Sequence, residues 1–147
     1  MLKNILVATD ASPASNRAVE MAADLAGRYQ TPLYILHVIR DMDLPPELRK
    51  MAEVERIFGP RADVLRFVAN KILDEARTRA QTAGAREIHT LMGEGDPAST
   101  IIRTAEENQV ELIVLGTRGL GEVKSMLLGS VSRKVSNLAG ISTLIVK

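Results

Sequence analysis

Short apolar runs alternate with longer amphipathic segments along the whole sequence, and this alternation restricts the fold more than any other feature. Between the apolar runs, hydrophobic residues recur at helical spacing. Strands that alternate with helices pair in parallel and carry helices on both faces of the sheet. The sequence therefore predicts one α/β domain over residues 1–147 with an open, five-stranded parallel sheet. The predicted strands are Lys3–Thr9, Leu33–Ile39, Glu87–Met92, Glu111–Leu115 and Thr143–Val146.

Capping residues indicate where the helices begin. Ser12 and Asp96 each stand before a proline, and proline suits the first position of a helix. Gly84 stands where a C-terminal cap belongs. The charged Arg40–Pro60 segment contains three prolines and is predicted to be a long surface loop. The predicted helices are Pro13–Tyr29, Arg61–Ala83 (with Phe67 and Leu73 widening its apolar stripe), a helix from Pro97 through Ala105, and Ser130–Ala139.

Composition excludes several classes of function. The formal net charge is +1 and aromatic residues make up 3%, so nothing favours binding to nucleic acid or to an anionic membrane. No apolar run approaches the ~20 residues that span a bilayer. The chain has no cysteine, which excludes disulfides, thiolate metal sites and a cysteine nucleophile. We expect a cytoplasmic protein with neither nucleic acid nor membrane as a partner.

A glycine-rich stretch follows the fourth predicted strand. Gly116, Gly119 and Gly129 bracket a segment that carries Arg118 and precedes a helix beginning at Ser130. Glycine lets the backbone approach a ligand closely, and the free N–H groups at a helix start suit an anion. A plain connection in an α/β fold has about 2–6 residues, fewer than this one. The stretch therefore predicts a phosphate-binding loop.

Asp10 follows the first predicted strand directly. In open α/β sheets, ligands lie beyond the carboxyl ends of the strands, where the direction of winding reverses. An aspartate there either caps the next helix or takes part in a site. A carboxylate repels phosphate, so a role at a nucleotide requires a ribose hydroxyl or a divalent cation as its partner.

Several segments resemble one family. The spacing Gly116-x2-Gly119-x9-Gly129-Ser130 resembles the nucleotide-binding signature of the universal stress protein family. The opening ILVATDASPAS resembles that family's first strand and aspartate turn. LYILHVIR, ELIVLGTRG and TLIVK resemble its second, fourth and last strands. The similarity covers the chain except Arg40–Pro60.

The resemblance implies a Rossmann-like fold of the adenine nucleotide alpha hydrolase-like type, with strand order 3-2-1-4-5. It also implies ATP between the ends of strands one and four, Mg²⁺ or Mn²⁺ on its phosphates, and a homodimer formed through Thr143–Val146. Asp10 would meet the ribose or a phosphate-bound cation, and Val38 would hold the adenine edge through its backbone. The remaining implied contacts are Ala8 and Thr9 with the nucleoside, and Gly116, Arg118, Gly119, Gly129, Ser130, Val131 and Ser132 with the ribose and phosphates.

Two other patterns are weaker. Gly93-Glu94-Gly95-Asp96-Pro97-Ala98 matches the dinucleotide pattern GxGxxA, but its carboxylates would lie where a pyrophosphate belongs, so a capped helix start explains it better. His37 and His89 lie inside strand patterns without a partner cluster, which favours core or sheet-edge histidines over a metal site.

The sequence leaves three functions open. The first is an ATP-binding stress-response protein with at most slow hydrolysis, since no general base stands out. The second is a dimeric interaction module of the same fold with no ligand or another one. The third is a transferase of the related nucleotide alpha hydrolase type, which predicts a catalytic motif that the sequence does not contain.

Overall fold

The computed structural model describes residues 1–40, 61–117 and 128–147. The predicted Arg40–Pro60 loop, apart from Arg40 itself, lies outside these residues. The described part contains one sheet of five parallel strands in the order β3-β2-β1-β4-β5, as predicted. The strands are β1 (Ile5–Ala8), β2 (Leu33–Ile39), β3 (Ile88–Glu94), β4 (Leu112–Gly116) and β5 (Ser142–Val146).

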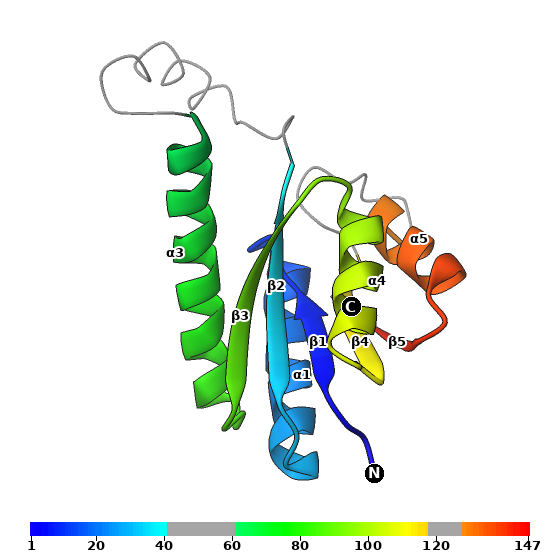
Figure 1. Cartoon of the computed structure of the whole chain (residues 1–147). Coiled ribbons are helices and arrows are strands. Elements are labelled where there is room, and N and C mark those ends of the chain that lie inside the picture. Colours follow the sequence, from blue (N-terminus) through cyan, green and yellow to red (C-terminus); the bar gives the residue numbers. More distant parts are fainter. Residues whose placement is uncertain (41–60, 118–127) are drawn as a thin grey trace.

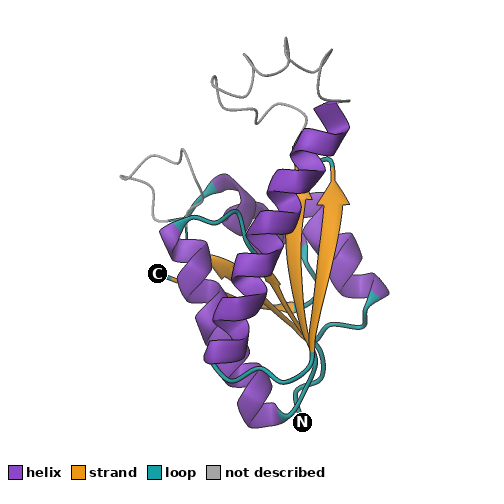
Figure 2. Cartoon of the chain, turned by 90° about the vertical axis from the view of Figure 1, so that its left-hand side faces the viewer, coloured by secondary structure: helices purple, strands orange, loops and turns teal. Residues whose placement is uncertain are grey.

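Helices cover both faces of the sheet (Figures 1 and 2). On one face, α1 (Pro13–Tyr29) and α3 (Arg61–Thr82) lie against each other and against the central strands. On the other face lie α4 (Pro97–Glu107) and α5 (Ser130–Leu138). This is the doubly wound arrangement that the strand and helix alternation predicts.

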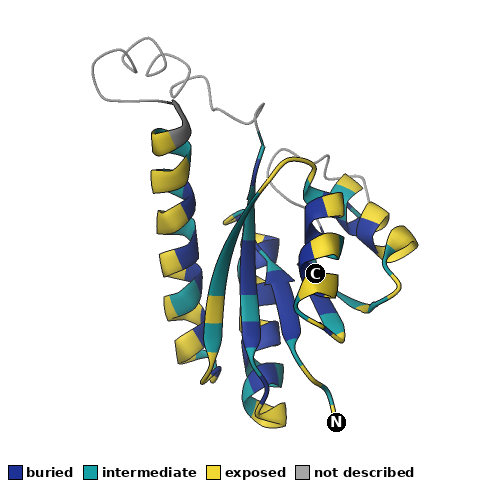
Figure 3. Ribbon diagram, viewed as in Figure 1, coloured by how far each residue is buried: buried dark blue, intermediate teal, exposed yellow. Residues whose placement is uncertain are grey.

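The core has two halves, one on each side of the sheet. Alternate residues of β1 divide between them, with Ile5 and Val7 facing α1 and α3, and Leu6 facing α4 and α5. Figure 3 shows the resulting burial of the central strands and of the inner helix faces. β1 is fully buried up to Val7 and pairs with β2 on one side and β4 on the other.

Two details of the sequence prediction are wrong. The third strand continues through Gly93 to Glu94, because β2 extends to Ile39 and keeps pairing with it. Phe67 does not widen the buried stripe of α3, since its side chain is 70% exposed. It lies two residues before the buried Ala69, which is about 200° around the helix.

The two weaker patterns have structural roles. Asp96 caps α4, and its carboxylate accepts hydrogen bonds from the backbone N–H (3.0 Å) and the hydroxyl (2.8 Å) of Ser99. His89 lies on the edge strand β3, where its Nε2 is 3.0 Å from Glu87 Oε1 and its ring stacks on Tyr34.

Candidate functional site

The winding of the sheet reverses at β1. The chain passes from β1 outwards through β2 to β3, then crosses back and continues from β4 to β5. Parallel strands bring all their carboxyl ends to one edge, so the exits of β1 and β4 are neighbours there. This is the position at which open α/β sheets bind ligands.

The turn after β1 is held by a dense set of hydrogen bonds. Thr9 is buried, and its hydroxyl accepts the backbone N–H of Ala11 at 3.2 Å. Ser15 donates its hydroxyl to the Ser12 carbonyl at 3.0 Å. Because that proton is committed, Thr9 must be the donor in the 3.1 Å contact between its Oγ1 and Ser15 Oγ. The hydroxyls therefore form a directed chain that ties the end of β1 to the first turn of α1.

Asp10 and Ala11 shape the same turn. Asp10 Oδ1 accepts the backbone N–H of Ser12 at 2.9 Å, so the carboxylate has a structural role. Ala11 has φ 66°, a left-handed conformation that a non-glycine residue adopts only when its surroundings impose it. This hydrogen bond supports the capping role of Asp10 and leaves its role at a ribose or a cation as a prediction.

The structure shows why position 116 must be a glycine, and the sequence analysis did not identify this reason. A Cβ atom there would lie 2.8 Å from Ala14 C and from Ser15 N, in the first turn of α1. The close approach that requires glycine is therefore an approach between β4 and α1. The chain continues through the buried Thr117, whose backbone N–H donates to the Val146 carbonyl at 2.9 Å.

The first turn of α5 stands beside the end of β4. Gly129, the N-cap residue, donates its N–H to the Thr117 carbonyl at 2.6 Å. Ser132 is buried and donates its hydroxyl to the Gly116 carbonyl, also at 2.6 Å. These two bonds fix the start of α5 at the carboxyl edge of the sheet. Ser132 is therefore an anchor, while Ser130 is exposed in the same turn.

This helix start differs from those of α1 and α4. Ser12 and Asp96 cap α1 and α4 through their side chains, whereas Gly129 has none and no side-chain cap hydrogen bond closes the first turn of α5. The described first turn also contains no acidic residue. Backbone N–H groups and the positive end of the helix dipole together suit a phosphate.

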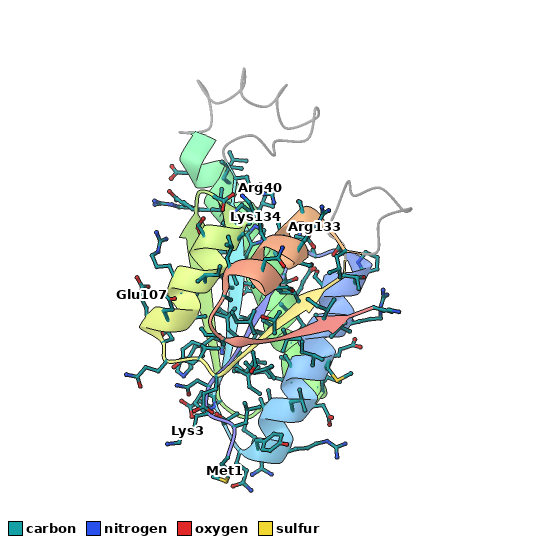
Figure 4. All side chains as sticks on the ribbon, turned by 90° about the vertical axis from the view of Figure 1, so that its right-hand side faces the viewer. Met1, Lys3, Arg40, Glu107, Arg133 and Lys134 are labelled. Atoms are coloured by element: carbon teal, nitrogen blue, oxygen red, sulfur yellow. The ribbon has the colours of Figure 1, made fainter. Side chains whose placement is uncertain are left out.

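Basic side chains gather at the same end of the molecule. Figure 4 shows Arg40, Arg133 and Lys134 near one another, with Lys3 at the opposite end. Lys134 Nζ lies 3.7 Å from Asp96 Oδ1. The hydrogen bonds from Ser99, and to a smaller extent the charges of Lys134 and Arg40, hold the pKa of the Asp96 carboxyl below its ordinary value. Lys134 and Arg40 therefore contribute positive charge near Asp96 at this edge.

The structure brings most of the predicted site residues to this edge. Ala8 ends β1 and Thr9 and Asp10 follow it, Val38 lies near the end of β2, and Gly116 ends β4. Gly129, Ser130, Val131 and Ser132 begin α5. Arg118 and Gly119 lie outside the described residues.

Sequence reasoning missed one neighbour of the site. His37 Nδ1 lies 2.8 Å from the Thr9 carbonyl oxygen, which joins the end of β2 to the turn after β1. The sequence predicts only a core or edge histidine. Its place one residue before Val38, near a strand end beside β1, was the signal that pointed to the site.

Other kinds of site receive no support from the described residues. Within residues 1–40, 61–117 and 128–147 no three histidine, aspartate or glutamate side chains form a group that could hold a metal ion. A search of the same residues gives no helix long and apolar enough to cross a bilayer. A surface hollow of about 820 Å³ lies between α1 and the second half of α3, away from the strand exits.

Comparisons with known proteins agree with this fold. The sequence model of the universal stress protein family matches residues 1–147. Universal stress protein YxiE of Bacillus subtilis is 37% identical over 149 residues, an alignment that covers 100% of both chains. Universal stress protein Rv1636 of Mycobacterium tuberculosis is 33% identical, with 98% of this chain and 95% of that protein covered. A solved universal stress protein in complex with cAMP has a TM-score of 0.73 at 28% identity, covering 99% of this chain and 96% of that one. This chain belongs to the universal stress protein family.

Proposed function

We propose that this protein binds an adenine nucleotide, ATP with Mg²⁺ on its phosphates, at the exits of β1 and β4, and that it acts in the stress response. The first turn of α5 carries the proposal: it lacks a side-chain cap and stands among basic residues at the point where the winding reverses. The related structure in complex with cAMP supports an adenine nucleotide as the class of ligand.

The residues present fit such a ligand. The N–H groups of the α5 first turn and the hydroxyl of Ser130 suit the phosphates, with Arg118 adding positive charge. The backbone at Ala8, Thr9 and Val38 lines the nucleoside in this proposal. Asp10 suits a ribose hydroxyl or the phosphate-bound Mg²⁺, because carboxylate oxygen is a ligand that Mg²⁺ prefers. The bound Mg²⁺ would neutralise phosphate charge.

A homodimer and a cytoplasmic location belong to the same proposal. β5 is an edge strand, and none of its residues is fully buried. Leu138, just before it, is 69% exposed. An edge of this kind suits pairing with a second copy through Thr143–Val146. The absence of cysteine suits a reducing compartment.

The first test is mass spectrometry of the purified protein, native and then denatured. We expect a dimer mass with bound nucleotide, and release of an adenine nucleotide on denaturation. Equilibrium dialysis with ATP and magnesium then gives the affinity. No bound nucleotide, together with no ATP binding at millimolar concentration, would refute nucleotide binding and favour the interaction module.

A charge substitution separates binding from folding. Ser130→Asp places a carboxylate in the α5 first turn, where it complements the helix dipole and should leave stability unchanged or raise it by about 0.3–1 kcal/mol. The same charge repels phosphates, so we expect ATP affinity to fall by about 10-fold or more, which is about 1.4 kcal/mol.

Ser136→Asp is the matched control. It adds the same charge to an exposed position of the same helix, about 9 Å further along the axis. We expect it to leave ATP affinity unchanged. Equal losses in the two variants would contradict phosphate binding at the start of α5.

A further inference from the structure

His37 makes a specific contact with the turn that follows β1. Its Nδ1 lies 2.8 Å from the carbonyl oxygen of Thr9, the first residue after the neighbouring strand β1. The ring is half-buried beside that turn. The contact spans 28 positions of sequence, so it joins two separate carboxyl ends of the sheet.

The partner atom fixes where the proton is. A carbonyl oxygen only accepts hydrogen bonds, so Nδ1 of His37 must carry the hydrogen and donate it. Both the neutral Nδ1–H tautomer and the protonated ring keep that hydrogen. The contact therefore requires only that Nδ1 carries its hydrogen, and its role is geometric.

Every polar group of Thr9 has a partner in this arrangement. Its backbone N–H donates to the Leu36 carbonyl at 2.9 Å, and its hydroxyl contacts Ser15 and the N–H of Ala11. The bond from His37 to the carbonyl completes the set.

The Thr9 carbonyl belongs to the peptide unit that leads into Asp10. A peptide unit is planar, so the direction of the Thr9 carbonyl fixes the direction of the Asp10 N–H and the position of the Asp10 Cα, from which the side chain starts. One residue further on, Ala11 is held at φ 66°. A donor on the Thr9 carbonyl opposes rotation of this peptide plane towards a less strained turn.

We propose that His37 is a positioning residue for the nucleotide site, acting through the Thr9 carbonyl to hold the peptide plane that leads into Asp10. The inference rests on the proposed nucleotide binding. It adds His37 as a residue that affects the ligand indirectly, through the position of Asp10. It also predicts the tautomer of the ring, which is independent of any ligand.

The test compares three substitutions in the full-length protein. His37→Phe keeps a ring without the donor, and His37→Asn places an amide N–H near the position of Nδ1. His89→Ala is the control, because this second histidine lies on the edge strand and contacts Glu87 and Tyr34. Circular dichroism first establishes that each variant is folded at the temperature of the binding measurement.

We expect His37→Phe to weaken ATP binding by about 3- to 10-fold, the range for one hydrogen bond. His37→Asn should stay within about 2-fold of the unchanged protein, and His89→Ala should match it. Long-range ¹H–¹⁵N NMR of the imidazole should show His37 with its hydrogen on Nδ1.

Three results would overturn the inference. One is a His37→Phe protein that melts at a lower temperature but binds ATP as before, which indicates a purely structural role. Another is a His37→Asn protein that loses as much affinity as His37→Phe. The third is a neutral His37 with its hydrogen on Nε2. If the unchanged protein itself binds no adenine nucleotide, the proposed function fails and the inference fails with it, whereas the first two results leave nucleotide binding intact.

Discussion

The contact between Gly116 and the start of α1 gives the sharpest prediction of stability. In Gly116→Ala, the new Cβ would meet Ala14 C and Ser15 N at 2.8 Å, and ordinary van der Waals contact begins at 3.4 Å. The strand and the helix must therefore separate by about 0.6 Å, because both atoms are backbone and cannot rotate away. Overpacking of this kind costs about 1–3 kcal/mol.

Thermal unfolding measures this cost. For a domain of this size, 1 kcal/mol lowers the melting temperature by about 2–4 °C, so a cost of about 1–3 kcal/mol should lower that of Gly116→Ala by about 2–12 °C. Two other glycines supply controls. Gly140 has open space around its position and no positive φ, so Gly140→Ala should change stability by less than about 0.5 kcal/mol.

Gly84 separates backbone conformation from crowding. It also has open space, but its φ is 114°, so Gly84→Ala should cost about 1–3 kcal/mol through backbone strain alone. If Gly116→Ala melts at the same temperature as Gly140→Ala, the close contact between β4 and α1 is wrong. If the contact is right, a loss of nucleotide binding in a Gly116 variant reports disturbed packing, and Ser130→Asp is the better test of the phosphate site.

Two further substitutions test the ends of helices and strands. Ala11→Gly should keep the free energy of unfolding or raise it by up to about 1 kcal/mol, because φ 66° is strained for alanine and not for glycine; urea unfolding checks this, and a clear loss would contradict it. Asp96→Ala should lower stability by about 1 kcal/mol at neutral pH through loss of the cap. The folded-state pKa of Asp96 is depressed, so the carboxylate stabilises the fold above its ordinary value of 3.8 and loses this effect as the pH falls through the folded value. The difference in melting temperature between the two proteins should therefore shrink in acid, and a constant difference would refute the assignment.

Much of the fold follows from local patterns. The strands are short, the three central ones are largely buried and apolar, and Ser12 and Asp96 cap their helices as their types and the following prolines predict. Strand order is different, because periodicity carries no information about which strands are neighbours. Only the resemblance implied the order 3-2-1-4-5 that the structure shows.

The sequence identifies many residues of the candidate site, but it does not predict which atoms they contact. Residues that follow strands were identifiable, since parallel strands share one exit edge. The reason for Gly116 was not, because the crowding atom belongs to α1, about a hundred residues away in the sequence. The partner of His37 could not be predicted either. Which atom His37 contacts depends on the register between β1 and β2, and the local sequence of one strand gives no information about that register.

The pairing of β1 also determines when the site can exist during synthesis. Ile5 pairs with Leu33, which leaves the ribosome early, and with Leu112, which leaves after α4. β1 therefore cannot pair on both sides until β4 has been synthesised, and the first turn of α5 is synthesised later still. An adenine nucleotide bound across these exits would recognise only a finished chain, so its binding would favour completed molecules over nascent or truncated ones in the cell.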